Sequence, residues 1–475
     1  MPILPKITVK GEEGLSQEEL WQSLFSKRNI KAVFQKHILP KGGQGVDRIS
    51  VERFQADIDQ QAAIIKRKCI SGTYKFSPYL ELLQSKGRGK EPRVVSIPTV
   101  RDRIVLKILT EYLHTTFSSY IAKDLPNTVI RKIKDKIYPL KKNDRYIKID
   151  LKKFYDSIPH DQLLENIKTS NNHPPFIRLI YRSITNPTLP ANYSIKQKKE
   201  SKSPKGVAQG LSISNILAEI YVRALDEKIK PLSKAYFRFV DDIFILCEEK
   251  NTKEIWKEAS QSLKKLGLSV SKEKSTPQDT ARPIEEGFEF LGYNFSGSVI
   301  SVRDSSYRKF LESLIGGIIR FKYEYKKASS EEKELKKQIF TEEMNERITG
   351  AIDQNRKYGW MFFFSEIDDL AMLAKIDTIV SQTLTRISIF SPDDLKKVKR
   401  ITRAYYETNH SPKRGYIHNY NFYSTVNQKM DYLIKIGQLK VDPERGYTAE
   451  EIDLRFEQAK ARNLLKLERD VSTFS

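Results

Sequence analysis

Apolar and polar residues alternate along this chain with two different periods, and the balance between them changes near residue 305. Before residue 70, apolar positions recur every three or four residues, as in FQADIDQQAAIIKRKC, which predicts amphipathic helices. Between residues 79 and 98, the β-rich runs YLELLQ and RVVSIP flank a basic tip that contains glycine, which predicts a hairpin. Helical spacing returns over residues 101–119.

Later segments combine strands with turns. The stretch RYIKIDLKKFYDSIPHDQLLENI passes from an alternating strand through a loop into a helix, with Asp150 at the strand end. YFRFVDDIFILC is a pair of β-rich runs around an acidic dipeptide, and EGFEFLGYNFSG is another strand pair. After about Ser305 nearly every segment has helical spacing. The pattern therefore predicts an α+β fold followed by a helical C-terminal third.

Length and charge indicate the organisation and the class of partner. A chain of 475 residues exceeds one compact core, so several packed units are expected. Lysine and arginine outnumber acidic residues 83 to 60, and this net charge of +23 favours nucleic acid as the partner. No apolar run is long enough to cross a bilayer and the start does not resemble a signal peptide, so we expect no membrane partner. The two cysteines cannot build a disulfide framework, which fits a cytoplasmic location.

The acidic pair Asp241-Asp242 is the main candidate for chemistry. Adjacent carboxylates repel and raise each other's pKa, so a pair between two apolar strands indicates a nearby cation. Asp150 ends another strand and can converge on the same point, which would give an all-oxygen ligand set for two Mg²⁺ ions. The alternative is an ordinary polar hairpin turn, because acidic residues are common in turns. The pair alone does not decide between them.

The motifs around this pair resemble those of the reverse transcriptases, in the same order. Phe239-Val-Asp-Asp242 is similar to the family's Tyr-x-Asp-Asp motif, with Phe for Tyr. The segment from Asp150 to Asp156 resembles the motif that supplies the first catalytic aspartate. Gln209-Gly-Leu-Ser-Ile-Ser-Asn215 is similar to the Gln-Gly-x-x-x-Ser-Pro segment beneath the template and the incoming nucleotide, but Asn215 replaces proline.

The resemblance implies a set of site residues and cofactors. Two Mg²⁺ ions would be bound, with Mn²⁺ able to substitute, and Tyr155 would be the aromatic steric gate that excludes a ribose 2′-hydroxyl. Lys86 and Arg93 would grip the triphosphate from the hairpin, and Lys274 would protonate the leaving pyrophosphate. The implied residues are: catalytic Asp150, Asp241 and Asp242; metal-binding Asp150, Leu151, Asp241 and Asp242; dNTP-binding Lys86, Arg93, Tyr155, Gln209, Gly210 and Lys274; and primer-gripping Phe290, Leu291 and Gly292.

The same resemblance implies a right-hand polymerase with fingers, a palm that contains an antiparallel sheet, a helical thumb and an α-helical C-terminal extension. The expected divisions are 1–145 for the N-terminal helical region and fingers, 146–300 for the palm with an inserted fingers segment at about 165–205, 301–400 for the thumb, and 401–475 for the extension. The aromatic residues at 358–364 could stack bases, but an apolar stripe at helical spacing is more often core, so we expect core.

Among reverse transcriptases, the chain looks most like the bacterial defence-associated (unknown-group, abortive-infection-like) enzymes, and more distantly like group II intron and retron enzymes. The Phe-Val-Asp-Asp variant, the Ser-x-Ser-Asn run and the long helical tail carry this resemblance. It implies a non-coding RNA template, dNTP substrates, a DNA product and a role in stopping phage infection, and it leaves a homo-oligomer open. Two distant cysteines cannot supply the zinc sites of an intron-homing nuclease.

Two other functions stay open at this point. The first is a template-independent or protein-primed DNA nucleotidyltransferase on the same fold. The second is a non-catalytic, maturase-like RNA-binding protein that uses the palm only as a scaffold. The presence of all three aspartates argues against the second, and Tyr155 favours deoxynucleotides over ribonucleotides.

Overall fold

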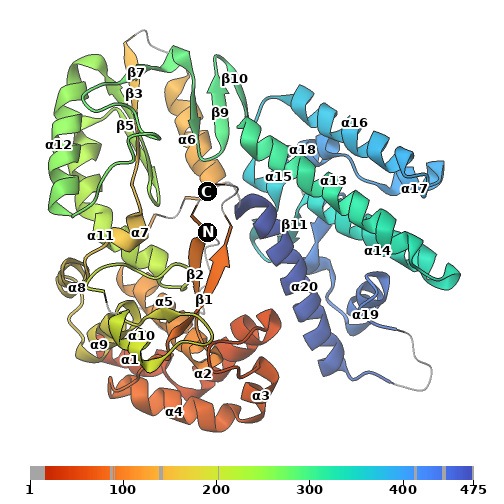
Figure 1. Ribbon diagram of the computed structural model, residues 1–475, viewed down its shortest axis with the longest axis horizontal. Coiled ribbons are helices and arrows are strands. Elements are labelled where there is room, and N and C mark those ends of the chain that lie inside the picture. Colours follow the sequence, from red (N-terminus) through yellow and green to blue (C-terminus); the bar gives the residue numbers. More distant parts are fainter. Residues whose placement is uncertain are drawn as a thin grey trace. The chain divides into compact units, whose positions relative to one another are not determined.

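The computed structural model describes residues 16–85, 89, 91–122, 124–138, 143–201, 203–410, 415–440 and 446–472. The chain divides into two compact units (Figure 1). The first comprises Ile3–Asp124 and Pro139–Pro283, and the second comprises Leu125–Tyr138 and Ile284–Ser475. This division is coarser than the four-part division expected from the sequence, which stays a prediction.

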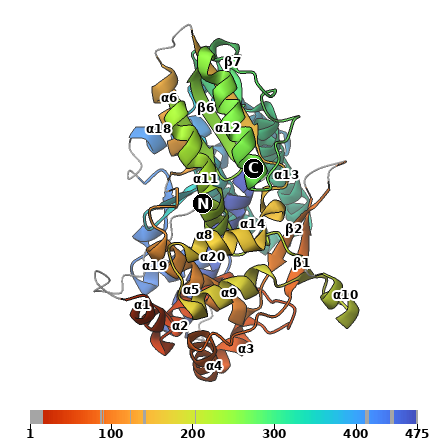
Figure 2. The ribbon, with the colours of Figure 1, turned by 90° about the vertical axis from the view of Figure 1, so that its left-hand side faces the viewer.

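Helices form one end of the first unit, as expected from the helical spacing (Figure 2). Trp21 is fully buried there, with its ring 5.0 Å from that of Tyr112 and 6.1 Å from that of Phe176. Ser16 and Glu19 form a capping box that starts the first helix. The helices of this region are α1 (Gln17–Leu24), α2 (Lys27–Val33), α3 (Val51–Ala56), α4 (Ile58–Ile70), α5 (Val100–Thr116), α9 (Pro174–Ile184) and α10 (Ile195–Glu200).

The predicted hairpin is confirmed. Strands β1 (Tyr79–Gln84) and β2 (Arg93–Ile97) pair antiparallel, with Gln84 opposite Arg93. A third strand, β4 (Thr188–Leu189), pairs parallel with β1. Arg93 is therefore the first residue of a strand whose position is set by a sheet.

A four-stranded sheet carries the predicted acidic motifs. Its strand order is β5-β6-β3-β7, and all pairs are antiparallel. Tyr146 stacks on Phe244 across β3 and β6, with ring centroids 5.7 Å apart. The strands are β3 (Asp144–Asp150), β5 (Ala235–Phe239), β6 (Asp242–Glu248) and β7 (Arg282–Pro283), and the helices of this part are α7 (Phe154–Ser157), α8 (His160–Lys168), α11 (Ser214–Ile229) and α12 (Thr252–Lys265). Since β6 is buried from Ile243 to Cys247, the sheet is the core of this part.

The second unit is mainly helical, as predicted for the C-terminal third, and also contains two small sheets. One has the strand order β10-β9-β8 and the other β12-β11-β13. Its elements are α6 (Pro126–Ile137), β8 (Phe288–Phe290), β9 (Tyr293–Ser296), β10 (Val299–Val302), α13 (Asp304–Lys326), α14 (Ser330–Thr349), β11 (Ala351–Asp353), β12 (Arg356–Tyr358), α15 (Trp360–Phe363), α16 (Leu370–Arg386), α17 (Pro392–Lys397), α18 (Ile401–His410), β13 (His418–Asn419), α19 (Val426–Lys435) and α20 (Ala449–Ser472).

The aromatic run of this unit is core, as the sequence indicated. Trp360 and Phe364 are fully buried, and Trp360 stacks on Phe310 with ring centroids 4.4 Å apart. These rings therefore stabilise the packing of the second unit. Among the described residues of the whole chain, no helix is long and apolar enough to span a membrane.

Candidate active site

The antiparallel register brings the three predicted aspartates to one end of the four-stranded sheet. Asp150 is the last residue of β3 and lies directly opposite Asp242, the first residue of β6. Asp241 occupies the turn before β6, where its main-chain carbonyl accepts a hydrogen bond from the Leu151 N–H at 3.2 Å. Cross-strand neighbours point to the same face of a sheet, so Asp150 and Asp242 share a face. The sequence predicted Asp150 at a strand end, and the strand register shows that Asp242 lies opposite it.

The turn itself has an unusual backbone. Val240 has a φ of 58°, in the left-handed region that β-branched residues rarely adopt. Such a conformation costs about 1–3 kcal/mol and persists only where the surroundings impose it. A two-residue turn between paired strands needs positive φ values for its geometry, and here Val240 supplies one. The strain therefore lies next to Asp241.

Burial and mutual repulsion make the acidic pair unfavourable in its charged form. Burial, followed by the charge of Asp150, raises the pKa of Asp241. Burial, followed by the charge of Asp241, raises the pKa of Asp242 to about 7. The charges of Lys274 and Arg93 act in the opposite direction on Asp241. The negative charge at this end of the sheet is thus only partly balanced by the protein.

A divalent cation would complete that balance. The three carboxylates supply oxygen donors of the kind that Mg²⁺ prefers, so the donor chemistry fits. Among the residues that the structure describes, no three Asp, Glu, His or Cys side chains are grouped closely enough to hold an ion as they stand. The carboxylates would have to close around a bound metal. The structure records the Leu151 N–H in its hydrogen bond to Asp241, and a metal-binding role for Leu151 stays a prediction.

Lys274 reaches the site from a loop that is tied to the end of β3. The Lys274 ammonium lies 3.2 Å from Oδ1 of Asp150, although most of its side chain is exposed. Ser271 N–H donates to the Asp150 carbonyl at 2.8 Å, and the Asp150 N–H donates to the Ser275 hydroxyl at 2.9 Å. These two bonds hold the loop, and the sequence alone did not indicate Ser271 or Ser275.

Gln209 and Gly210 lie just before helix α11 and contact strand β2 of the hairpin. The Gln209 carbonyl accepts a hydrogen bond from the Ser96 N–H at 2.8 Å. Gly210 has a φ of 98°, and a Cβ placed on it would lie 2.8 Å from Cγ1 of Val95. Only glycine fits this close approach of two backbones. Glycine at position 210 therefore allows β2 to pack closely against the segment before α11.

Arg93 and Lys86 were both predicted to grip a triphosphate. Arg93 begins β2, and its charge lowers the pKa of Asp241, so its guanidinium acts on the same space as the carboxylates. Lys86 lies outside the residues that the structure describes. For this pair the structure therefore places only Arg93 near the acidic turn.

Tyr155 lies in the short helix α7, close to the acidic turn. Burial, followed by the charges of Asp241 and Glu219, raises the pKa of its phenol well above the ordinary value. The phenol therefore stays protonated near neutral pH, and it donates a hydrogen bond to the amide oxygen of Asn215. The ring is half-buried. Tyr155, the predicted steric gate, thus lies near the acidic turn.

Arg238 is a buried residue of this site that sequence reasoning missed. It lies on β5, three residues before Asp241, and its guanidinium binds Glu219 at 2.7 Å and Asp226 at 2.7 Å. It also donates a hydrogen bond to the Val240 carbonyl at 3.2 Å. The available signal was an arginine inside an otherwise apolar strand.

The predicted primer-gripping residues lie in the second unit. Phe290 ends β8 and is buried, while Leu291 and Gly292 form the turn to β9 with φ values of 48° and 81°. The Arg303 N–H donates to the Gly292 carbonyl at 2.9 Å. These contacts explain the turn within its own unit, and its contact with a primer stays a prediction.

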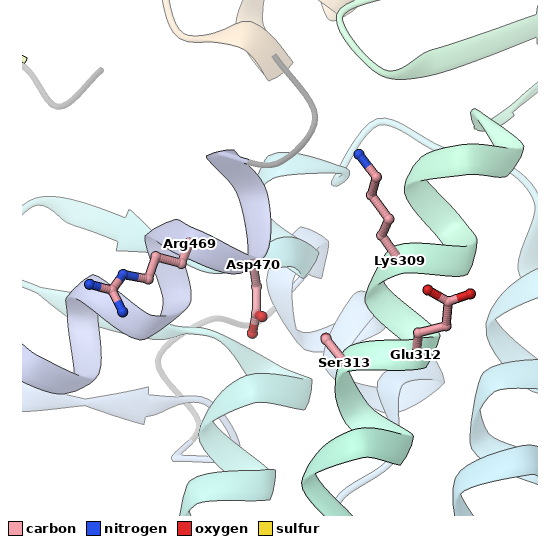
Figure 3. A pocket seen from close by; sticks show the side chains of 5 residues that line it. All are labelled: Lys309, Glu312, Ser313, Arg469 and Asp470. Atoms are coloured by element: carbon pink, nitrogen blue, oxygen red, sulfur yellow. The ribbon is translucent and has the colours of Figure 1, made fainter. Parts of the chain in front are cut away.

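A cavity of about 460 Å³ in the second unit contains none of the predicted site residues (Figure 3). It is lined by Lys309, Glu312, Ser313, Arg469 and Asp470, from the facing helices α13 and α20. Arg347 binds Asp470 at 2.8 Å and the Ser313 hydroxyl at 2.7 Å, so it ties the two helices together. We interpret this cavity as part of the helix packing.

Part of this chain is similar to known proteins. Residues 85–295 match the family described as reverse transcriptase (RNA-dependent DNA polymerase). The COX1/OXI3 intron 1 protein of Saccharomyces cerevisiae is 25% identical over 289 residues, which cover 48% of this chain and 33% of the yeast protein. Protein YkfC of Escherichia coli is 24% identical over 193 residues, which cover 38% of this chain and 49% of that protein. The chain thus spans about a third to a half of the length of these two relatives.

Solved telomerases are more distant. The structure of a Candida albicans telomerase with a fragment of telomeric RNA aligns with 82% of this chain and 66% of that chain, at 13% identity and a TM-score of 0.41. An apo telomerase of Candida tropicalis aligns with 48% of this chain and 55% of that chain, at 17% identity and a TM-score of 0.35.

The family match covers residues 85–295, which include the antiparallel sheet and the carboxylates at its end. This part of the chain is therefore similar to the reverse transcriptases. The α+β architecture with a helical C-terminal region, expected from the sequence, is confirmed.

Proposed function

We propose that this protein is an RNA-directed DNA polymerase that adds dNTPs to a primer by two-metal nucleotidyl transfer. One observation carries the proposal: the register that sets Asp150 directly opposite Asp242, with Asp241 in the adjoining turn. Three carboxylates carried to one end of a sheet by separate segments offer the oxygen donors that divalent cations prefer. The positive groups of Lys274 and Arg93 act on the same space and suit a triphosphate.

The residues of the chain divide the work among them. Two divalent cations, Mg²⁺ or Mn²⁺, would activate the attacking hydroxyl and stabilise the leaving oxygen when bound at Asp150, Asp241 and Asp242. Arg93 binds triphosphate oxygens through its guanidinium, and Lys274 gives a proton to the leaving pyrophosphate. Tyr155 closes the space beside the sugar. Gly210 lets the segment before α11 approach β2, the strand that Arg93 begins.

The partner nucleic acid follows from charge and from family resemblance. A net charge of +23 supports a polyanion bound through its phosphates, without base-specific contacts. We propose that the template is a non-coding RNA and that the enzyme works in the cytoplasm in bacterial antiviral defence. The Phe-Val-Asp-Asp variant at 239–242 and the Ser-x-Ser-Asn run at 212–215 support this assignment. The thumb would be the helices of 301–400, and residues 290–292 would hold the primer end.

The test is DNA synthesis by the purified protein with its co-purifying RNA. Mg²⁺ and labelled dNTPs are added, separately and together, and any product is sequenced. The variant D241N/D242N should make no product while binding RNA as the wild type does. The matched control D59N/D393N removes two carboxylates that are exposed by 81% and 83%, and should retain synthesis.

Each outcome has a clear meaning. A product that copies the RNA supports reverse transcription. An untemplated product overturns the RNA-directed part of the proposal in favour of a nucleotidyltransferase. Normal RNA binding by a wild-type protein that makes no product overturns the proposal in favour of a non-catalytic RNA-binding protein.

A further inference from the structure

The first turn of helix α11 contacts the phenol of Tyr155. Asn215 is the second residue of that helix, and its amide oxygen accepts the hydrogen bond of the Tyr155 hydroxyl. The two residues are 60 positions apart in the chain. A phenylalanine ring would fill the same volume beside the sugar, so sterics alone do not require this hydroxyl. Its partner on α11 therefore calls for a different explanation.

The main chain of Tyr155 is held by the same segment. The Val207 N–H donates to the Tyr155 carbonyl at 2.8 Å, eight residues before Asn215. The Ser214 hydroxyl donates to the Ala208 carbonyl at 2.6 Å and closes the loop between these two points. Residues 207–215 thus hold Tyr155 at its backbone and at the tip of its ring. With both ends held, the ring has little freedom to rotate or withdraw.

Steric exclusion depends on that immobility. A 2′-hydroxyl differs from hydrogen by a single oxygen atom, so a ring that withdraws by about 1 Å admits it. A ribonucleotide can then enter the site at the free-energy cost of moving the ring. A hydrogen bond to the Tyr155 hydroxyl raises that cost. Shape alone discriminates weakly between such close analogues unless the pocket is rigid.

We propose that Asn215 is a positioning residue that determines sugar specificity, because it fixes Tyr155 against the incoming nucleotide. The inference rests on the proposed DNA polymerase function and goes beyond it in naming what keeps the gate closed. The effect of Asn215 passes through the hydroxyl of Tyr155, which predicts that either partner can be altered with the same result.

Position 215 allows a substitution that spares the helix. Proline is tolerated in the first turn of a helix, where the N–H has no intrahelical partner. The variant N215P therefore keeps α11 and removes the acceptor. N215A removes the acceptor with the smallest change in volume, and Y155F removes the donor while it keeps the ring.

The experiment measures kcat/KM for each dNTP and for the matching ribonucleotide, in a double-mutant cycle of Y155F, N215A and Y155F/N215A, with N215P alongside. Each variant should lower the preference for deoxynucleotides about fivefold to tenfold, the worth of one hydrogen bond. The double variant should lower it no further than each single one. The change should come mainly from a higher kcat/KM for ribonucleotides.

A control separates positioning from general loosening of this segment. Thr110 donates a hydrogen bond at 2.8 Å to the hydroxyl of Ser212, a residue of the 207–215 segment, and does not bond to Tyr155. T110V should leave the sugar preference unchanged even if it lowers the melting temperature. A shift in T110V as large as that in N215A would overturn the inference.

Failure of the inference and failure of the proposed function look different. If the wild type polymerises dNTPs and the Asn215 variants retain its sugar preference, the inference is wrong and the function stands. Multiplicative effects in the double variant would also overturn it, because the two residues would then act independently. If the wild type polymerises nothing, the proposed function fails, and the inference fails with it.

Discussion

Arg238 donates a hydrogen bond to the main-chain carbonyl of Val240, at 3.2 Å, in the turn that carries the two adjacent aspartates. Val240 has a positive φ, and the same guanidinium is held by Glu219 and Asp226 of helix α11. The strained residue is thus tied to a buried ion-pair network. The network explains how a β-branched residue remains in an unfavourable conformation.

Replacement of Arg238 by methionine should destabilise the protein strongly. The substitution leaves the buried Glu219 and Asp226 without their cation, and breaking such a buried pair costs about 3–5 kcal/mol. It also releases the Val240 carbonyl, so DNA synthesis should fall more than the folded fraction does. Urea unfolding and primer extension on the same preparation measure both effects.

The control for this prediction is Arg308, whose side chain is 69% exposed beside Asp304. R308M should change the free energy of unfolding by less than about 0.5 kcal/mol, as is usual for exposed ion pairs. Equal losses in R238M and R308M would show that the buried network has no special role.

Replacement of Asp242 by asparagine should raise stability while it removes activity. Burial and the charge of Asp241 make ionised Asp242 unfavourable, and asparagine keeps the shape without the charge. The free energy of unfolding should rise by about 1 kcal/mol in the absence of divalent ions, as expected where function and stability compete. Thermal unfolding in EDTA measures it, and a lower melting temperature for D242N would contradict the repulsion argument.

Alanine at position 210 should displace strand β2. A Cβ there would lie 2.8 Å from Cγ1 of Val95 and 3.1 Å from the Ser96 carbonyl, at a φ of 98°. We expect the strained backbone and the clash to lower the free energy of unfolding by about 2 kcal/mol or more. Since Arg93 begins the same strand, KM for dNTPs should rise as well.

Gly297 gives the matched control for G210A. It also has a positive φ, of 57°, but no atom of the residues that the structure describes lies within 4 Å of a Cβ built on it. Backbone strain in G297A should therefore lower the free energy of unfolding by about 1 kcal/mol, and KM for dNTPs should stay unchanged. Equal KM values for G210A and the wild type would remove the proposed link between Gly210 and Arg93.

Asp394 should make stability depend on acid pH. Hydrogen bonding to Lys337, and then to Ser391 and Lys397, holds the pKa of this carboxyl well below its ordinary value of 3.8. A depressed folded pKa means that the contribution is complete above the unfolded value and is lost as the pH falls below it. D394N should therefore be less stable than the wild type at pH 7, and the difference should shrink below about pH 4.

Asp393 is the neighbouring control, because its side chain is 83% exposed and pairs only with Lys396 in the described part of the chain. D393N should follow the wild-type curve of unfolding free energy against pH within about 0.5 kcal/mol. A constant difference between D394N and the wild type from pH 7 down to pH 2 would show that the carboxylate charge is not the cause.

Local patterns in the sequence were enough to predict the elements that carry the site. The β-rich runs on either side of Asp241 and Asp242 predicted two strands and a turn, and the end of an alternating run placed Asp150. The hairpin before Arg93 and the helical C-terminal third were predicted in the same way. Each of these is a matter of side-chain period over about ten residues, which the sequence records directly.

Only the tertiary structure decided which of these elements meet. The register that sets Asp150 opposite Asp242 joins strands about 90 residues apart, and Asn215 meets Tyr155 across 60. The acidic partners of Arg238 lie on helix α11, 12 and 19 residues away in the chain, and the strands β11 to β13 are too short to show a period. Such pairings depend on which surfaces are buried together, and this is a property of the whole packed unit that no local run of residues contains.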